Sequence, residues 1–85
     1  MVLHVLYFAS VREKIGLAEE QVDPPVSVAT VNDLMDFLAT RSAGHASAFV
    51  QRTTIRSALD QVHVPASTLI GSAREIAFFP PVTGG

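Results

Sequence analysis

The first eight residues of the chain are apolar except for His4, and they divide into two faces when the chain is read with a period of two. Residues 2–8 place Leu3, Val5 and Tyr7 on one side of an extended backbone. Successive side chains of a β-strand point to opposite faces of the sheet, so this period of two predicts a strand over 2–8 with these three residues in the core. Residues 19–22 are expected to form a second strand that closes a hairpin with the first.

The same alternation returns near the other end of the chain, over residues 75–79. There Ile76 and Phe78 are expected to point into the core. Pro80 and Pro81 then stop the strand, because a proline has no backbone N–H to donate to a neighbouring strand. The pattern therefore predicts a strand that ends directly before two prolines.

The outward sides of these two predicted strands carry apolar residues as well. Leu6 and Phe8 on the first strand, with Ala77 and Phe79 on the last, would form an exposed apolar patch if the strands are neighbours. Such patches often mark contacts between proteins. The alternative is a loop that covers these side chains; we favour the contact surface.

A period of 3.6 residues replaces the alternation in the middle of the chain. Thr30 is a good N-cap residue, and Asp33 suits the first turn of a helix. Apolar residues then recur at positions i, i+3, i+4 and i+7, which are Val31, Leu34, Met35 and Leu38. This spacing predicts an amphipathic helix with an apolar stripe in the core. We expect the helix to end at Ser42-Ala43-Gly44.

Shorter elements fill the remaining segments. Residues 10–15 are expected to form a short helix with Ser10 as its N-cap. Residues 54–59 and 62–64 are expected to form strands on either side of a turn at 60–61. Strands and helices in this order predict an α+β domain whose main helix packs on one face of a sheet.

Composition narrows the class of the protein. Eighty-five residues, of which 48% are hydrophobic and 16% charged, suit a single folded domain and argue against disorder. No apolar run approaches the ~20 residues of a membrane span, and no signal peptide is visible. A formal net charge of -2 removes the electrostatic basis for binding nucleic acid. The default is a cytoplasmic protein with small-molecule or protein partners.

The chain contains no cysteine and three scattered histidines. The missing cysteines exclude disulfides, thiolate metal sites and a cysteine nucleophile. The histidines lack metal-ligand spacing, so we expect no metal, and no residue set suggests an enzyme that acts alone. If this protein carries sulfur, its terminal carboxyl group must hold it, because it cannot form a persulfide of its own.

The last six residues, Pro-Pro-Val-Thr-Gly-Gly, permit two interpretations. One is a frayed end, as at most domain termini. The other is that the terminal carboxylate is the functional group. Glycine has no side chain, so Gly84 and Gly85 would fit a channel too narrow for other residues and bring the carboxylate into another protein's active site.

Residues 78–85, Phe-Phe-Pro-Pro-Val-Thr-Gly-Gly, closely resemble the end of the small, sulfur-carrier subunits of molybdopterin synthase. Residues 5–13, Val-Leu-Tyr-Phe-Ala-Ser-Val-Arg-Glu, resemble the opening of the same family, so the resemblance covers the whole chain. It implies the β-grasp, or ubiquitin-like, fold, in which the first and last strands lie side by side and parallel at the centre of a mixed sheet. It also implies a β-grasp domain at 1–79 and a flexible tail at 80–85.

The resemblance further implies the chemistry of the tail. A ubiquitin-activating-type adenylyltransferase would use ATP to attach AMP to the terminal carboxylate, and sulfur that comes indirectly from a donor protein would replace the AMP. Gly85 would then carry a thiocarboxylate, and Gly84 would give clearance. Four residues would hold the tail extended: Pro80, Pro81, Val82 and Thr83. The domain itself would bind no cofactor.

The implied acceptor is the large, catalytic subunit of molybdopterin synthase, which converts cyclic pyranopterin monophosphate to the dithiolene of molybdopterin. That family assembles as a heterotetramer, with a small subunit at each end of a large-subunit dimer. Phe8 and Phe79 would anchor the interface, and Arg12 is a further candidate contact. The sequence departs from the family at Asp60, where asparagine is usual, and at Ser72-Ala73-Arg74, where an Asp-Gly-Asp-type turn is usual.

Two other functions stay open. The first is a sulfur carrier of the same fold for another pathway, such as thiamine synthesis or tRNA thiolation, although the aromatic-Pro-Pro signature favours molybdopterin. The second is a ubiquitin-like modifier or adaptor, whose tail is conjugated to a lysine or simply bound.

Overall fold

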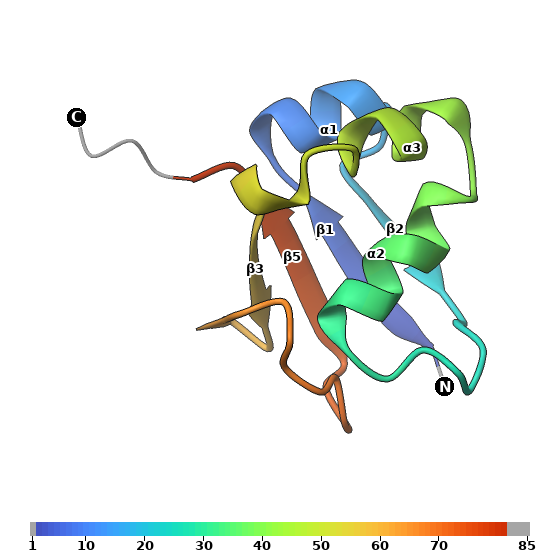
Figure 1. Cartoon of the computed structure of the whole chain (residues 1–85), viewed down its shortest axis with the longest axis vertical. Coiled ribbons are helices and arrows are strands. Elements are labelled where there is room, and N and C mark those ends of the chain that lie inside the picture. The colour runs from blue at the N-terminus through green and yellow to red at the C-terminus, as the bar shows by residue number, and fades with distance from the viewer. Residues whose placement is uncertain (1, 82–85) are drawn as a thin grey trace.

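The computed structural model of the chain describes residues 2–81. A five-stranded sheet carries the helices on one face (Figure 1). The strands are β1 (Leu3–Tyr7), β2 (Glu19–Val22), β3 (Arg56–Leu59), β4 (Val62–Val64) and β5 (Glu75–Phe79). The helices are α1 (Ala9–Ile15), α2 (Val31–Ala39) and α3 (Ala43–Ala48), followed by a single 3-10 turn, η1 (Arg52–Thr54). This is the predicted α+β architecture.

The strands follow the spatial order β2-β1-β5-β3-β4. β1 and β2 form the predicted antiparallel hairpin. β1 and β5 are parallel neighbours in the middle of the sheet, as the β-grasp resemblance implied. β3 then pairs antiparallel with both β5 and β4. Because β1 and β5 run in the same direction, both strands end at the same end of the sheet, and α1 begins there as well.

The helix-covered face of the sheet, called the closed face below, holds the core. The inward residues that the alternation predicts are all buried: Leu3, Val5, Tyr7, Ile76 and Phe78. The predicted stripe of α2 is also buried and packs in the same cluster. Thr30 caps α2, since its Oγ1 accepts the N–H of Asp33 while the Asp33 carboxylate accepts the N–H of Thr30, each at 3.1 Å. These predictions are confirmed.

The expected end of α2 is wrong. The helix stops at Ala39, and Ser42-Ala43-Gly44 begins a separate helix, α3, whose N-cap is Ser42. Gly44 suits this place for a tertiary reason. A Cβ at Gly44 would lie 2.5 Å from the carbonyl oxygen of Lys14, so only glycine lets α3 approach the end of α1 this closely.

The predicted cap of α1 is wrong as well. The helix begins at Ala9, Phe8 occupies the N-cap position, and Ser10 lies inside the first turn without capping it. The chain turns sharply at Ala9, where φ is 50°, and the carbonyl of Phe8 accepts the N–H groups of Val11 and Arg12. β3 is also shorter than predicted, because residues 52–54 form η1 instead of extended backbone.

The predicted turn at 60–61 is confirmed, and it explains one departure from the family's pattern. Asp60 and Gln61 both have positive φ, at 46° and 72°, as a tight two-residue hairpin requires. Oδ1 of Asp60 accepts the backbone N–H groups of Arg74 and Glu75, each at 3.0 Å. A carboxylate supplies this acceptor as an asparagine oxygen would, so the hairpin stays tied to the start of β5.

Candidate functional site

The chain leaves the sheet at the end of β5. Phe79 is the last residue of the strand, and Pro80 and Pro81 follow it, both partly exposed. Figure 1 shows this exit beside η1, at the edge of the sheet where β1 ends. Four of the predicted site residues lie outside the described part of the chain, so their roles stay predictions: Val82, Thr83, Gly84 and Gly85.

A hollow of about 240 Å³ lies at the base of this exit. Pro80 and Pro81 form one wall, and residues from α1, α3 and the segment around η1 form the rest. These other lining residues are Ser10, Val11, Lys14, Ala48, Gln51, Thr54 and Ile55. A protein that holds the chain beyond Pro81 would therefore also lie next to α1 and η1.

The face of the sheet away from the helices, called the open face below, carries a row of side chains that crosses four strands. Residues directly opposite each other on paired strands point to the same face. Leu6 is paired with Ala77, Ala77 with Ala58, and Ala58 with His63. The row is apolar on its three inner strands and ends on the edge strand β4 in a histidine; at the opposite edge, on β2, Glu19 is paired with Leu6.

The predicted apolar patch of Leu6, Phe8, Ala77 and Phe79 is largely confirmed. Phe8 is 48% exposed, so no loop within residues 2–81 covers it, and Leu6 and Phe79 are partly exposed. Ala77 is the exception and a correction, because it is only 9% exposed. Its side chain is too short to rise above its neighbours in the row.

The structure brings the predicted contact residues of the described chain to one end of the molecule. The N–H of Phe8 donates to the carbonyl of Phe78, which places Phe8 next to the end of β5. Arg12 is exposed one helical turn after Phe8, and no carboxylate within residues 2–81 pairs with it. Phe8, Arg12, Phe79 and the two prolines therefore lie close to the exit of the chain, as an interface around the tail requires.

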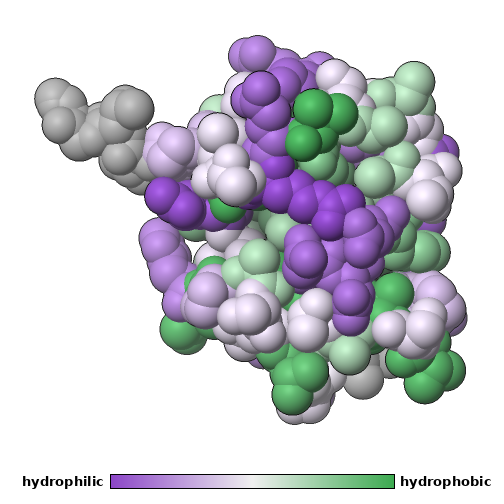
Figure 2. Space-filling view, in the orientation of Figure 1, coloured by the Kyte–Doolittle hydropathy of each residue, from purple (hydrophilic) through white to green (hydrophobic). Residues whose placement is uncertain are grey.

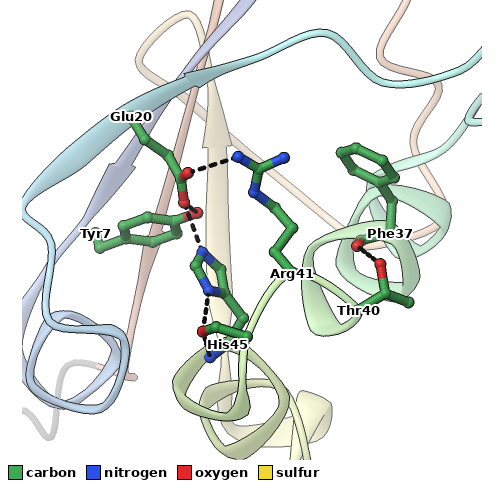
Figure 3. A network of polar contacts seen from close by, with 7 residues as sticks. Tyr7, Glu20, Phe37, Thr40, Arg41 and His45 are labelled. Atoms are coloured by element: carbon green, nitrogen blue, oxygen red, sulfur yellow. Dashed lines mark hydrogen bonds and ion pairs between the residues drawn. The ribbon is translucent and has the colours of Figure 1, made fainter.

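A buried polar network, which the sequence analysis missed, lies on the closed face (Figure 3). Oε2 of Glu20 accepts the Tyr7 hydroxyl at 2.7 Å and lies 2.6 Å from Nε2 of His45. Oε1 of Glu20 lies 3.3 Å from Nη2 of Arg41. Nδ1 of His45 lies 2.7 Å from the hydroxyl of Ser42. The network joins β1, β2, α3 and the loop before α3.

The network shifts two pKa values in opposite directions. Burial opposes the charged form of Glu20, but the hydrogen bonds from His45 and Tyr7 outweigh it and lower the pKa of the Glu20 carboxyl below its usual value. Burial, together with the hydrogen bond to Glu20, raises the pKa of Tyr7 far above its usual value. Glu20 is therefore a partly buried carboxylate that is charged and hydrogen-bonded at neutral pH.

The sequence contains a signal that would have found this network. The alternation of β2 places Glu20 on the same side as buried Val22, although Glu19 and Gln21 point the other way. An acidic residue on an inward position needs a partner. His45, the partner, lies 25 positions further along the chain, so local sequence patterns do not reveal it.

A second hollow lies at the end of the molecule away from the chain's exit. It measures about 630 Å³, and its lining includes Leu3 and the exposed residues Val26 and Leu69. In the space-filling view, hydrophobic residues gather at this end, while hydrophilic residues form a band across the helical face (Figure 2). This hollow lies at the start of β1, whereas the tail leaves from the end of the parallel strand β5, so the two sites are at opposite ends of the sheet.

Within residues 2–81, no group of three or more histidine, aspartate or glutamate residues is placed to hold a metal ion. None of the described helices is both long and apolar enough to cross a membrane. The described side chains thus offer a surface around the exit of the tail and no metal centre.

Comparisons with known proteins agree with this geometry. The sequence profile of the ThiS family matches residues 5–85. The molybdopterin synthase sulfur carrier subunit of Haemophilus influenzae is 36% identical over 83 residues, which cover 98% of this chain and 99% of that protein. The subunit of the same name from Escherichia coli (strain K12) is 35% identical over equal shares of both chains.

A solved structure is similar over the full length of both chains. The crystal structure of SAMP1 from Haloferax volcanii superposes with a TM-score of 0.71 at 26% identity, and it covers 100% of each chain. This likeness agrees with the β-grasp fold.

Proposed function

The chain belongs to the ThiS family and its curated relatives are sulfur carriers, and from this premise we propose that the carboxyl group of Gly85 is the group that carries sulfur. The observation that supports this most strongly is the combination of a sulfur-carrier family and a chain without cysteine. A carrier of sulfur needs a covalent attachment point, and no thiol is available. The carboxyl group after two glycines is the remaining candidate.

The proposed reaction begins with activation. A carboxylate is a poor acyl donor, so a ubiquitin-activating-type adenylyltransferase joins it to AMP from ATP, and pyrophosphate leaves. A sulfur nucleophile then attacks the acyl carbon, the carbon–sulfur bond forms, and AMP departs with the electrons of the broken carbon–oxygen bond. Because this step needs ATP, we assign the protein to the cytoplasm.

The thiocarboxylate then acts as the nucleophile. Sulfur holds negative charge well, so the group is ionised near neutral pH, as a reactive cysteine must be. We propose that the tail enters the large subunit of molybdopterin synthase, where its sulfur bonds to a carbon of cyclic pyranopterin monophosphate in place of an oxygen substituent. Water then cleaves the acyl carbon–sulfur bond and restores the Gly85 carboxylate, and two carrier chains supply the two sulfurs of the dithiolene. The large subunit supplies orientation and charge stabilisation. The small chain itself catalyses nothing and binds no cofactor.

The residues that the structure describes support a chain that presents its tail to a catalytic partner. Pro80 and Pro81 follow a central, well-paired strand, so the tail starts from a fixed point. Phe8 and Phe79 flank that point with exposed apolar surface. A partner that grips both the patch and the tail would hold the last residues in one orientation.

Mass spectrometry tests the proposal. The chain is incubated with the adenylyltransferase, ATP and inorganic sulfide, and we expect a gain of about 16 Da, because sulfur replaces one oxygen at the acyl carbon. Tandem mass spectrometry should locate the gain at Gly85. A chain that lacks Gly85, and a chain with one alanine added after it, are the matched controls: both should keep the far-ultraviolet circular dichroism spectrum and gain no sulfur. Sulfur on any other residue, or none at all, overturns the proposal.

Complementation distinguishes the pathway. Expression in a strain that lacks its own small subunit should restore molybdopterin, while a strain that lacks its thiamine sulfur carrier should not recover. The reverse result would assign the chain to the other pathway.

A modifier role is the second candidate, because the chain shares its fold with the small archaeal modifier protein 1 of H. volcanii, with a TM-score of 0.70 at 24% identity. A modifier forms an isopeptide bond between its terminal carboxyl group and a lysine of another protein. Digestion of cell extracts followed by mass spectrometry would reveal lysines that carry the residues of this tail. Such adducts, in cells where the sulfur gain is absent, would favour the modifier over the carrier.

A further inference from the structure

His63 lies on the open face next to the apolar patch of Leu6, Phe8 and Phe79. We call this patch, with His63, the docking surface. His63 lies opposite Ala58 on the edge strand β4, at the end of the apolar row that crosses the sheet. Its ring centroid is 5.2 Å from that of Phe79, with the two rings tilted by 53°. The imidazole therefore contacts the residue after which the tail begins.

The groups that face His63 offer little to a positive charge. β5 presents Phe79 beside it and β3 presents Ala58, both apolar. Arg56 stands on the same face of β3, opposite Phe79, and is exposed; within residues 2–81 no carboxylate pairs with it. The carboxylate of Asp60, in the turn before β4, already accepts two backbone N–H groups of the β5 segment. Of the open-face carboxylates, Glu19 lies at the far edge of the same row, opposite Leu6, and Glu75 lies in the neighbouring row, opposite His4.

We propose that His63 packs, in its uncharged form, under the large subunit that receives the tail, and that its protonation weakens this complex. The inference rests on the proposed function for the identity of the occupant. Phe79 is the last residue before Pro80, so the protein that holds the tail reaches the Phe79–His63 pair without a gap. A partner with an apolar side chain over Ala58 and Ala77 matches this surface.

The sign of the effect follows from solvation. A neutral imidazole can be covered by apolar surface at little cost, whereas an imidazolium loses its hydration and gains no opposite charge. The guanidinium of Arg56, diagonal to His63 on the same face, adds like-charge repulsion. The complex therefore selects the neutral form, and lowering the pH shifts the equilibrium toward the free chains.

The test measures the dissociation constant of the complex with the purified large subunit from the same organism, at about pH 7.5 and about pH 5.5. If the complex accepts only the uncharged imidazole, its dissociation constant should be higher at about pH 5.5 than at about pH 7.5, by at most about tenfold for each unit of pH. The variant His63→Leu keeps an apolar side chain of similar size and cannot titrate. Because His63 lies in the proposed contact, the readout is the ratio of the dissociation constants at the two pH values and not the absolute affinity; we expect this ratio to be smaller for His63→Leu than for the unmodified chain.

The large subunit's own titrating groups are present in both complexes. Comparing the unmodified chain with His63→Leu therefore removes their contribution to the pH dependence. His4→Leu is the matched control on this chain, because His4 lies on the same face but pairs with Glu19 at 3.2 Å, away from the exit of the tail. It should keep the pH dependence of the unmodified chain. Circular dichroism at both pH values confirms that each variant is folded.

Equal rises for the unmodified chain and His63→Leu would overturn the role of His63 while leaving the carrier function intact. A rise that disappears in His4→Leu instead would overturn it as well. Absence of any complex at pH 7.5, for every variant, would overturn the docking surface together with the proposed acceptor. Sulfur gain at Gly85, measured separately, distinguishes these outcomes from failure of the carrier function.

Discussion

Phe78 and Phe79 are adjacent, chemically identical and placed in opposite surroundings. Phe78 points to the closed face, is fully buried, and stacks at 6.5 Å on Tyr7 while Phe49 meets it edge-on at 5.1 Å. Phe79 points to the open face, is partly exposed, and contacts His63. One strand thus gives the domain its stability on one side and its contact surface on the other. Stability and docking should therefore respond to different substitutions.

The largest expected loss of stability comes from a substitution on the closed face. Phe78→Ala removes a ring from the centre of the core and should lower the free energy of unfolding by about 3–5 kcal/mol, because a cavity stays where the ring was. Urea denaturation followed by circular dichroism measures the loss. In a domain of this size the alanine variant can unfold outright, so Phe78→Leu, with a loss of about 1 kcal/mol, is the graded companion. Losses no larger than those at Phe79 would contradict the comparison.

A smaller loss of stability is expected from a substitution in the polar network of Tyr7, Glu20, Arg41 and His45 on the same face. Glu20→Gln keeps the size of the side chain but removes the charge that His45, Tyr7 and Arg41 surround. Hydrogen bonds to a charged group contribute about 1.5–3 kcal/mol, and a neutral amide keeps part of this, so we expect a loss of about 1–2 kcal/mol at pH 7. Chemical denaturation of both chains measures it.

The difference in free energy of unfolding between the unmodified chain and Glu20→Gln should also depend on pH. The folded pKa of Glu20 is lowered from its model-compound value of 4.5, so the stability that its charge contributes is present above that value. It is lost as the pH falls through the lower, folded pKa. The difference between the unmodified chain and Glu20→Gln should therefore shrink steadily as the pH is lowered below 4.5. A difference that stays constant down to about pH 3 would show that the charge of Glu20 contributes nothing.

The contrast between the faces also explains what could be predicted from the sequence. Alternation records which side of a strand is buried, so Ile76 and Phe78 could be assigned to the core, and the stripe of α2 could be assigned by its helical period. Leu6 and Phe8 could be assigned to the outside for the same reason. The adjacency of β1 and β5, however, came from the family resemblance, because alternation within one strand carries no information about its neighbour.

The missed features all depend on contacts between distant segments. Gly44 looks like a helix end in local sequence, yet it lies inside α3, where the carbonyl of Lys14 leaves no room for a Cβ. Ser10 is a residue type that favours the N-cap, but the turn at Ala9 places it two positions after the N-cap, which is Phe8. The contact of His63 with Phe79 needs β3 to lie between β4 and β5, which no motif in the sequence indicates.

The smallest expected effect on stability is at Phe79, and this makes it the sharpest test of the comparison. Phe79→Ala truncates a partly exposed ring at the end of β5, so the free energy of unfolding should fall by less than about 1 kcal/mol. Its complex with the large subunit should nevertheless weaken at least tenfold, because a large aromatic side chain at the centre of an interface typically contributes 2 kcal/mol or more, on the order of thirtyfold in the dissociation constant. Isothermal titration calorimetry at pH 7.5 measures the affinity, and Val62→Ala, an exposed residue of the edge strand that faces the other side of the sheet, is the matched control. If Phe79→Ala and Val62→Ala bind alike, the open face is ordinary surface, and the tail alone must recruit the partner.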